Sequence, residues 1–146
     1  MNVTANVDLV FEVFHAIERR NRARVLSFCQ PDVEFLWQPS LPYGGGLGGT
    51  WAQTWLPVQP TWAEQRMDPR VVAAREHEVV VLWQQRGARG AGERLDTPVL
   101  GLYEVRDQKL ARAQMFYFDP GAVADFLVRA SQPGPGGVNV THGGGI

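Results

Sequence analysis

The stretch Val99–Leu127 most constrains the fold, because it predicts two consecutive strands that run directly into a helix. Residues alternate with a period of two before residue 106, and a second, strongly apolar strand follows at 110–118. Residues 106–109 predict the polar turn between them. Asp119 is expected to cap the next helix, with Pro120 in its first position. A long hairpin followed at once by a capped helix is typical of an α+β domain.

The other elements are predicted from the spacing of apolar residues. We expect helices at 5–19 and 23–28, and strands at 33–37, 70–76, 78–86 and 94–105. Gly87–Gly92 predicts a flexible hairpin tip, and Pro98 a bulge or a sheet edge. Helices before a series of strands indicate an α+β fold whose curved sheet is mainly antiparallel.

Two segments are rich in glycine and proline. Residues 38–49 predict a loop, and no βαβ unit surrounds its glycine run, which argues against a nucleotide-binding loop. A lid hinge is the favoured functional interpretation, and a plain disordered loop is the alternative. A helix carrying Trp51 and Trp55 is expected next, with another turn at Trp62. Residues 131–146 predict a flexible tail, which leaves one domain at 1–130.

Charge and composition exclude several functions. The net charge of −1 over 146 residues argues against nucleic-acid or membrane partners. Cys29 is the single cysteine, so no intramolecular disulfide forms, and the N-terminus has no basic region of a secretion signal. We therefore expect a cytoplasmic protein. The three histidines are scattered, and neither a metal nor a cofactor is expected.

Three segments, 31–35, 98–107 and 116–119, carry a resemblance to a known family. Over residues 5–130 the chain resembles the SnoaL-like polyketide cyclases of the nuclear transport factor 2-like (NTF2-like) superfamily, which also holds ketosteroid isomerases and limonene-type epoxide hydrolases. The resemblance implies a cone of helices and curved sheet around one deep apolar pocket. It also implies a small apolar polyketide substrate and, commonly, a homodimer.

The sequence departs from these relatives at the positions that match their proton-transfer residues. The isomerase base falls near Gln38 and its tyrosine near Phe14, whereas the acid–base pair of the cyclases falls near Gly101 and Met115. None of these four side chains can take over that proton transfer. The epoxide-hydrolase pair has no clear counterpart around 83–86.

An aromatic cavity with few charges suits a large, apolar, unsaturated ligand. We expect the pocket to be lined by Phe14, Leu36, Trp37, Gln38, Trp51, Trp55, Trp62, Trp83, Val99, Gly101 and Met115. Core packing is an equally good interpretation for any one of the tryptophans taken singly.

Four residues are candidates for catalysis. Strand periodicity places Tyr103 and Tyr117 on the face of Gly101, where their hydroxyls can donate to a carbonyl, although a position at the rim of the sheet is at least as well supported. His15 is a candidate general base, but a helix-surface position is favoured for it. Glu34 is expected to approach the cavity mouth.

The leading hypothesis is a cyclase that closes a carbocycle by folding its substrate and excluding water. A cycloaddition is one reaction by which such a cyclase could close the ring. An isomerase or epoxide hydrolase using Glu34, Asp96 or His15 is the enzymatic alternative. A protein that only binds an apolar molecule, and an adaptor with an exposed apolar patch, are the non-enzymatic alternatives.

Overall fold

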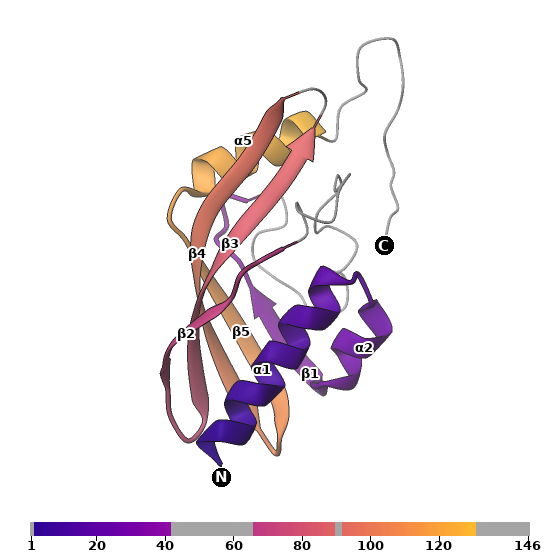
Figure 1. Cartoon of the computed structure of the whole chain (residues 1–146), viewed down its shortest axis with the longest axis vertical. Coiled ribbons are helices and arrows are strands. Elements are labelled where there is room, and N and C mark those ends of the chain that lie inside the picture. The colour runs from indigo at the N-terminus through magenta and orange to yellow at the C-terminus, as the bar shows by residue number, and fades with distance from the viewer. Residues whose placement is uncertain (1, 42–65, 90–91, 131–146) are drawn as a thin grey trace.

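The computed structural model describes residues 2–41, 66–89 and 92–130 (Figure 1). Its elements are α1 (Val3–Glu18), α2 (Arg22–Ser27), β1 (Cys29–Leu36), β2 (Arg70–Ala74), β3 (Glu78–Arg89), β4 (Glu93–Arg106), β5 (Lys109–Tyr117) and α5 (Pro120–Ala130). The predictions for Trp51, Trp55, Trp62 and the tail at 131–146 fall outside the described residues.

The strands form one sheet in the order β1-β5-β4-β3-β2. β1 is parallel to β5, and the remaining neighbours are antiparallel. The long strands β3 and β4 twist along their length, α1 and α2 lie together near one end, and α5 lies near the other end (Figure 1). The predicted α+β architecture with a curved, mainly antiparallel sheet is confirmed.

Local chemistry explains where two helices begin. The side-chain oxygen of Asn2 accepts hydrogen bonds from the backbone N–H groups of Thr4 at 2.9 Å and Ala5 at 3.3 Å, which caps α1. Asp119 does the same for α5, because its Oδ1 accepts from the N–H of Ala122 at 3.0 Å. The predicted cap at Asp119 is confirmed.

The β4–β5 hairpin turns tightly without glycine. Asp107 and Gln108 both have positive φ, at 52° and 62°, which is the backbone of a primed turn. This turn matches the right-handed twist of the strands, and the short polar side chain of Asp107 tolerates the left-handed region.

The prediction of a hairpin tip at Gly87–Gly92 is wrong for its first residues. β3 continues to Arg89, and Gly87 pairs with Leu95 inside the β3–β4 ladder. A Cβ at Gly87 would lie 2.8 Å from Cε1 of Phe126. Glycine is therefore present because a ring of α5 presses on this strand, not because the chain turns.

Pro98 marks neither an edge nor a bulge. It lies in the central strand β4, and it pairs with Gln84 of β3 without a register shift. Its carbonyl accepts from the N–H of Phe118 at 3.1 Å. In an extended residue the backbone N and O atoms point toward the same neighbouring strand. The position where Pro98 lacks an N–H therefore faces β5, at the point where β5 ends.

The core lies between the helices and the concave face of the sheet. Asn6 of α1 is only 2% exposed, and its amide donates to the carbonyl of Glu76 at 2.7 Å, which ties the helix to the turn between β2 and β3. The largest side chains buried there include Phe14, Leu110, Val10, Val25, Val79, Val81 and Val99.

Candidate functional site

Alternate residues of β4 and β5 form a buried row on the concave face. Gly101 pairs with Met115, and Val99 pairs with Tyr117. These residues and Tyr103 are buried, as the strand periodicity predicts. Phe14 of α1 packs against the Tyr103 end of this row.

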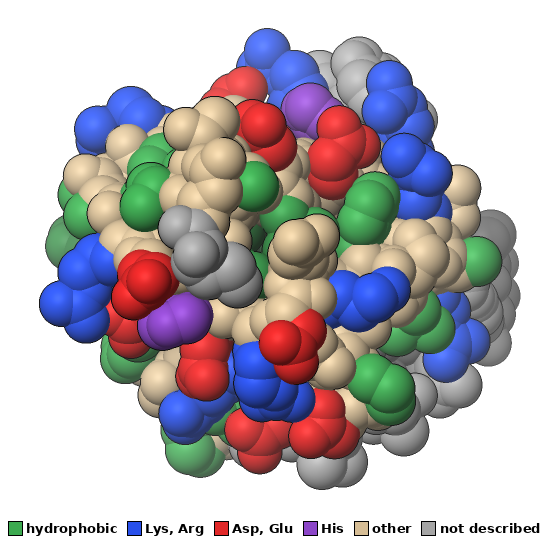
Figure 2. All heavy atoms as spheres, turned by 90° about the horizontal axis from the view of Figure 1, so that it is seen from below, with side chains coloured by type: hydrophobic (Ala, Val, Ile, Leu, Met, Phe, Trp, Pro, Cys, Tyr) green, Lys and Arg blue, Asp and Glu red, His purple; other side chains and the backbone are tan. Residues whose placement is uncertain are grey.

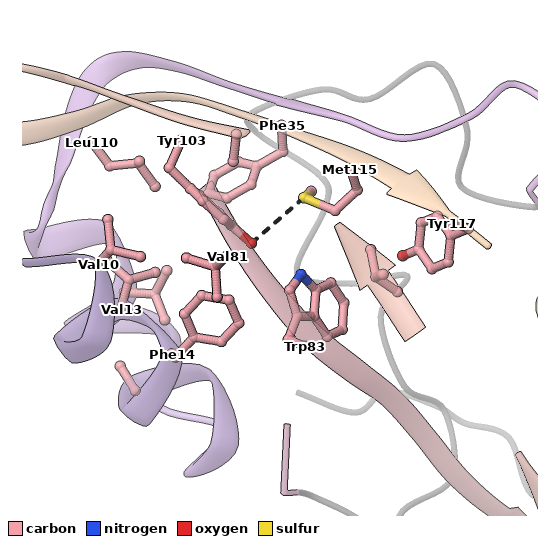
Figure 3. Close-up of a cluster of buried hydrophobic side chains, with 14 of the residues drawn as sticks. Val10, Val13, Phe14, Phe35, Val81, Trp83, Tyr103, Leu110, Met115 and Tyr117 are labelled. Atoms are coloured by element: carbon pink, nitrogen blue, oxygen red, sulfur yellow. Dashed lines mark hydrogen bonds between the residues drawn. The ribbon is translucent and has the colours of Figure 1, made fainter. Parts of the chain in front are cut away.

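Aromatic rings from four elements meet on this row (Figure 3). Phe14 of α1 packs edge-on against Trp83 of β3 at 5.9 Å between ring centroids, and against Tyr103 of β4 at 5.6 Å. Trp83 contacts Tyr117 of β5 at 6.3 Å. We call these four rings and Met115 the aromatic cluster; all five side chains are buried.

The phenol of Tyr103 lies over Gly101. A Cβ at Gly101 would fall 2.4 Å from the Tyr103 oxygen and 2.5 Å from its Cε2. The glycine therefore leaves space, as the sequence suggests, and the ring of Tyr103 occupies it. This close approach fixes the position of the hydroxyl inside the aromatic cluster.

The hydroxyl of Tyr103 is a donor rather than a base. It donates to Sδ of Met115 at 4.0 Å, and a thioether is a weak acceptor. Burial raises the pKa of Tyr103 well above its usual value, and the nearby indole N–H of Trp83 opposes this only in part. Tyr103 therefore stays protonated at neutral pH.

Polar side chains continue the concave face beyond the aromatic cluster. The hydroxyl of Tyr117 lies 3.5 Å from Oε1 of Gln85, to which it donates. Gln85 and Thr97 are 8% and 6% exposed. Sequence reasoning missed both, although they share the strand parity of Trp83 and Val99, which was the signal available.

Other catalytic candidates lie away from the aromatic cluster. His15 is exposed on α1, with its ring tilted against Phe11 at 6.5 Å between centroids. Glu34 is exposed and its carboxylate lies 3.9 Å from Nε of Arg112, so its approach to the cavity mouth stays a prediction. Asp96 is also exposed and pairs with Arg86 at 3.3 Å.

The predicted lining at the end of β1 is only partly on the concave side. Leu36 is half-buried and shares the parity of exposed Glu34, so it lies on the other face of β1 from buried Val33 and Phe35. Trp37 stacks on buried Phe35 at 6.0 Å between centroids. Oε1 of Gln38 accepts from the backbone N–H of Tyr117 at 2.6 Å, which holds β5 rather than a ligand.

Charged side chains are spread over the end of the molecule where the strand turns lie (Figure 2). A hollow of about 720 Å³ there is lined by Arg75, Glu76, His77, Glu78, Glu104, Val105 and Arg106. Arg75 pairs with Glu78 at its surface at 2.7 Å, and Nε2 of His77 lies 3.7 Å from the carboxylate of Glu76. This hollow suits solvent better than an apolar ligand.

The described residues contain no group of three or more His, Cys, Asp or Glu side chains that is arranged to hold a metal ion. Cys29 is buried and donates to the carbonyl of Val25 at 3.2 Å. Burial raises the pKa of its thiol to about 11, so little nucleophilic thiolate exists at neutral pH. Within the same residues, each helix is too short or too polar to span a membrane.

Comparison with solved structures shows an NTF2-like fold. Bal32a, from a soil-derived mobile gene cassette, is 13% identical, with 86% of this chain and 98% of that chain covered and a TM-score of 0.67. A candidate SnoaL-like polyketide cyclase from Jannaschia sp. CCS1 is 17% identical, with coverages of 89% and 94% and a TM-score of 0.63. TerC, co-crystallised with polyporic acid, is 18% identical, with coverages of 77% and 91% and a TM-score of 0.60.

These identities are too low to transfer an activity, and no curated protein matches the chain. The family comparison is more specific, because it matches residues 10–113 to the family described as the SnoaL-like domain. That range begins within α1 and ends within β5, and it includes Phe14, Trp83, Gly101 and Tyr103. The chain therefore belongs to the SnoaL-like domain family.

Proposed function

We propose that this protein closes a carbocycle in an apolar polyketide intermediate, by folding the substrate and donating a hydrogen bond to one of its carbonyl groups. The observation that carries the proposal is the aromatic cluster, in which a protonated phenol, Tyr103, lies among apolar rings. Membership of the SnoaL-like family supports the substrate class. The expected reaction joins two carbons of a conjugated chain by rearranging π electrons, so no atom is gained or lost.

A site of this kind accelerates ring closure in two ways. Rings that pack against a flexible chain hold its reacting carbons in contact, and this reduces the entropy lost on reaching the transition state. The Tyr103 hydroxyl polarises the carbonyl, which makes the conjugated system more electrophilic. Because the hydroxyl is buried, water does not compete for the same oxygen.

Incubation with a linear polyene ketone, followed by mass spectrometry and NMR of the product, tests the proposal. We expect a ring-closed isomer of unchanged mass. Tyr103→Phe should lower kcat by about 3- to 10-fold, the range for one neutral hydrogen bond. His15→Gln is the control and should leave turnover unchanged, because the imidazole is exposed. Unaltered substrate after incubation with the folded wild-type protein would contradict the proposal.

The same experiment separates the alternatives. An epoxide hydrolase adds one water to its product, but the three side chains considered for proton transfer, Glu34, Asp96 and His15, are all exposed. An isomerase that does not close a ring also leaves the mass unchanged, but the NMR spectrum of its product shows the carbon signals of an open chain. A binding protein holds the ketone and returns it unchanged.

We also propose that two copies of the chain associate through the outer face of the sheet. Leu100 of β4 and Phe116 of β5 are paired neighbours, and they are 40% and 47% exposed. Phe118, which follows β5, is 82% exposed. This apolar belt carries no charge, so a second copy of the same belt complements it around a two-fold axis.

The oligomeric state tests this second proposal. Sedimentation equilibrium should give a dimer for the wild type and a monomer for Phe116→Lys. Leu26→Lys is the matched control, because Leu26 is 40% exposed but lies on α2. A wild-type protein that stays monomeric at high concentration would refute association through the belt.

A further inference from the structure

The indole N–H of Trp83 is a buried donor that makes no hydrogen bond of normal geometry within the described part of the chain. Trp83 is 6% exposed, and among the described residues its Nε1 has no hydrogen-bond partner. An unsatisfied buried donor is costly, and native proteins almost always pair such groups. The acceptor is therefore expected to come from a bound molecule.

A second donor lies beside this indole. The nitrogen of Trp83 is directed toward the part of the aromatic cluster where the Tyr103 hydroxyl and the Met115 sulfur lie (Figure 3). The Trp83 indole N–H lies near the Tyr103 oxygen, where it opposes the rise in the pKa of the phenol, and the Tyr103 hydroxyl itself donates to that sulfur at 4.0 Å. A stronger oxygen acceptor would readily replace this weak contact.

Both donors are held by the fold before any ligand arrives. Trp83 is on β3, where it pairs with Val99 of the central strand, and the ring of Tyr103 lies against the backbone of Gly101. The ring of Phe14 packs edge-on against both side chains. Donors fixed in this way stabilise a partial negative charge without reorganising.

The chemistry of the two donors selects the ligand group. A carbonyl oxygen has two lone pairs and no proton, so it accepts from both donors at once, whereas a hydroxyl or an amide N–H would bring a further donor. The cluster contributes only uncharged rings and a thioether, which suits a neutral ligand better than a carboxylate.

We propose that Trp83 Nε1–H and Tyr103 O–H together bind the carbonyl oxygen of a conjugated ketone. This inference rests on the proposed function, since it names the substrate group that the aromatic cluster holds. It makes Trp83 a binding and activating residue, beyond the pocket lining that its sequence position suggests. In ring closure, the two hydrogen bonds strengthen as electron density moves onto the oxygen, so the transition state gains more than the bound substrate.

Proton–nitrogen correlation NMR of the full chain tests the donor pair, with α-tetralone and its parent hydrocarbon tetralin as probes. The five tryptophans give five indole signals, and Trp83→Phe identifies the one from Trp83. Conventional assignment of the wild type identifies it if that variant does not fold. The ketone should move the Trp83 indole proton downfield, and the hydrocarbon should not, because it has no acceptor.

Affinities provide the second measurement. Trp83→Phe should weaken α-tetralone binding by about 3- to 10-fold, the range for one neutral hydrogen bond, and should leave tetralin binding unchanged. Phe11→Leu is the control: Phe11 is half-buried on α1 outside the aromatic cluster, and its substitution should change neither affinity.

The possible failures are distinguishable. If both probes bind the wild type and the Trp83 signal does not respond differently to the ketone, the donor pair is refuted, and the proposal that the aromatic cluster binds an apolar guest stands. If neither probe binds the folded protein, that proposal fails, and the donor pair fails with it.

Discussion

Replacing Gly101 with alanine tests the packing at the centre of the concave face. The new Cβ would meet Oη, Cε2 and Cζ of Tyr103 at 2.4, 2.5 and 2.6 Å. Favourable contacts between carbon atoms lie near ~3.5–4.0 Å, so the ring has to move by about 1 Å or more. The variant therefore forces a large side chain out of its position.

The surroundings do not let the ring move freely. Tyr103 is 5% exposed, and Phe14 packs against it at 5.6 Å between centroids. Overpacking of this kind costs about 1–3 kcal/mol. Alanine offsets about 0.5–1 kcal/mol of this, because it loses less backbone entropy than glycine. The midpoints of these two ranges give an expected net loss of about 1 kcal/mol, or a fall in Tm of about 3–4 °C.

Urea unfolding followed by circular dichroism measures this loss. Gly121→Ala is the matched control, since its Cβ would meet only Oδ1 of Asp119, at an ordinary 3.7 Å. Gly121 is in the first turn of α5, so alanine there should stabilise by up to about 1 kcal/mol. A Gly101→Ala variant as stable as the wild type would refute the argument.

A double-mutant cycle identifies the cause of the loss. Tyr103→Leu removes the ring atoms that the new methyl group meets, so the cost of Gly101→Ala should fall by about 1 kcal/mol or more in that background. An equal cost in both backgrounds would mean that the methyl group acts on the backbone of β4 and not on the phenol.

Three further predictions concern groups outside the aromatic cluster. Asp119→Ala should cost about 0.5–2 kcal/mol in urea unfolding, through loss of the cap on Ala122, and should leave turnover unchanged; lost turnover at full stability would contradict a structural role. The Arg86 guanidinium, 2.6 Å from Asp68, holds the pKa of that carboxyl below its usual value. The pair therefore stabilises the fold above about pH 4, and this contribution is lost as the pH falls through the lowered pKa. Asp68→Asn should reduce the loss of unfolding free energy at acid pH by less than about 1 kcal/mol, because the carboxylate is half exposed. The same dependence of stability on acid pH in the variant and the wild type would refute a role for the Asp68–Arg86 pair. Cys29, whose pKa burial raises to about 11, should react with a disulfide reagent at neutral pH only after unfolding; equal rates in buffer and in urea would contradict this.

Strand periodicity predicted the concave face well where one side of a strand is buried and the other is exposed. In β4 and β5 the buried and exposed residues alternate, and the inward row of Gly101, Tyr103, Met115 and Tyr117 follows directly. The cap at Asp119 was equally predictable, because it depends only on neighbouring residues in the chain.

Predictions failed or stayed open where tertiary contacts decide the outcome. At the end of β1 both faces carry apolar residues, and the β1–β5 register shifts between Cys29 and Glu34, so the periodicity around Glu34 was ambiguous. Gly87 was interpreted as a turn because the pressure of the Phe126 ring is not visible in the sequence. The unpaired donor of Trp83 likewise appears only when the rings are placed in space.

The methyl group of Met115 provides the most direct test that a guest binds within the aromatic cluster. The chain has three methionines, and Met67, half-buried before β2, is the internal reference. In methyl NMR of the labelled protein, saturating α-tetralone should move the Met115 signal and leave Met67 in place. If the protein is saturated with α-tetralone and the Met115 signal does not move, the guest binds elsewhere. That result would contradict binding within the aromatic cluster.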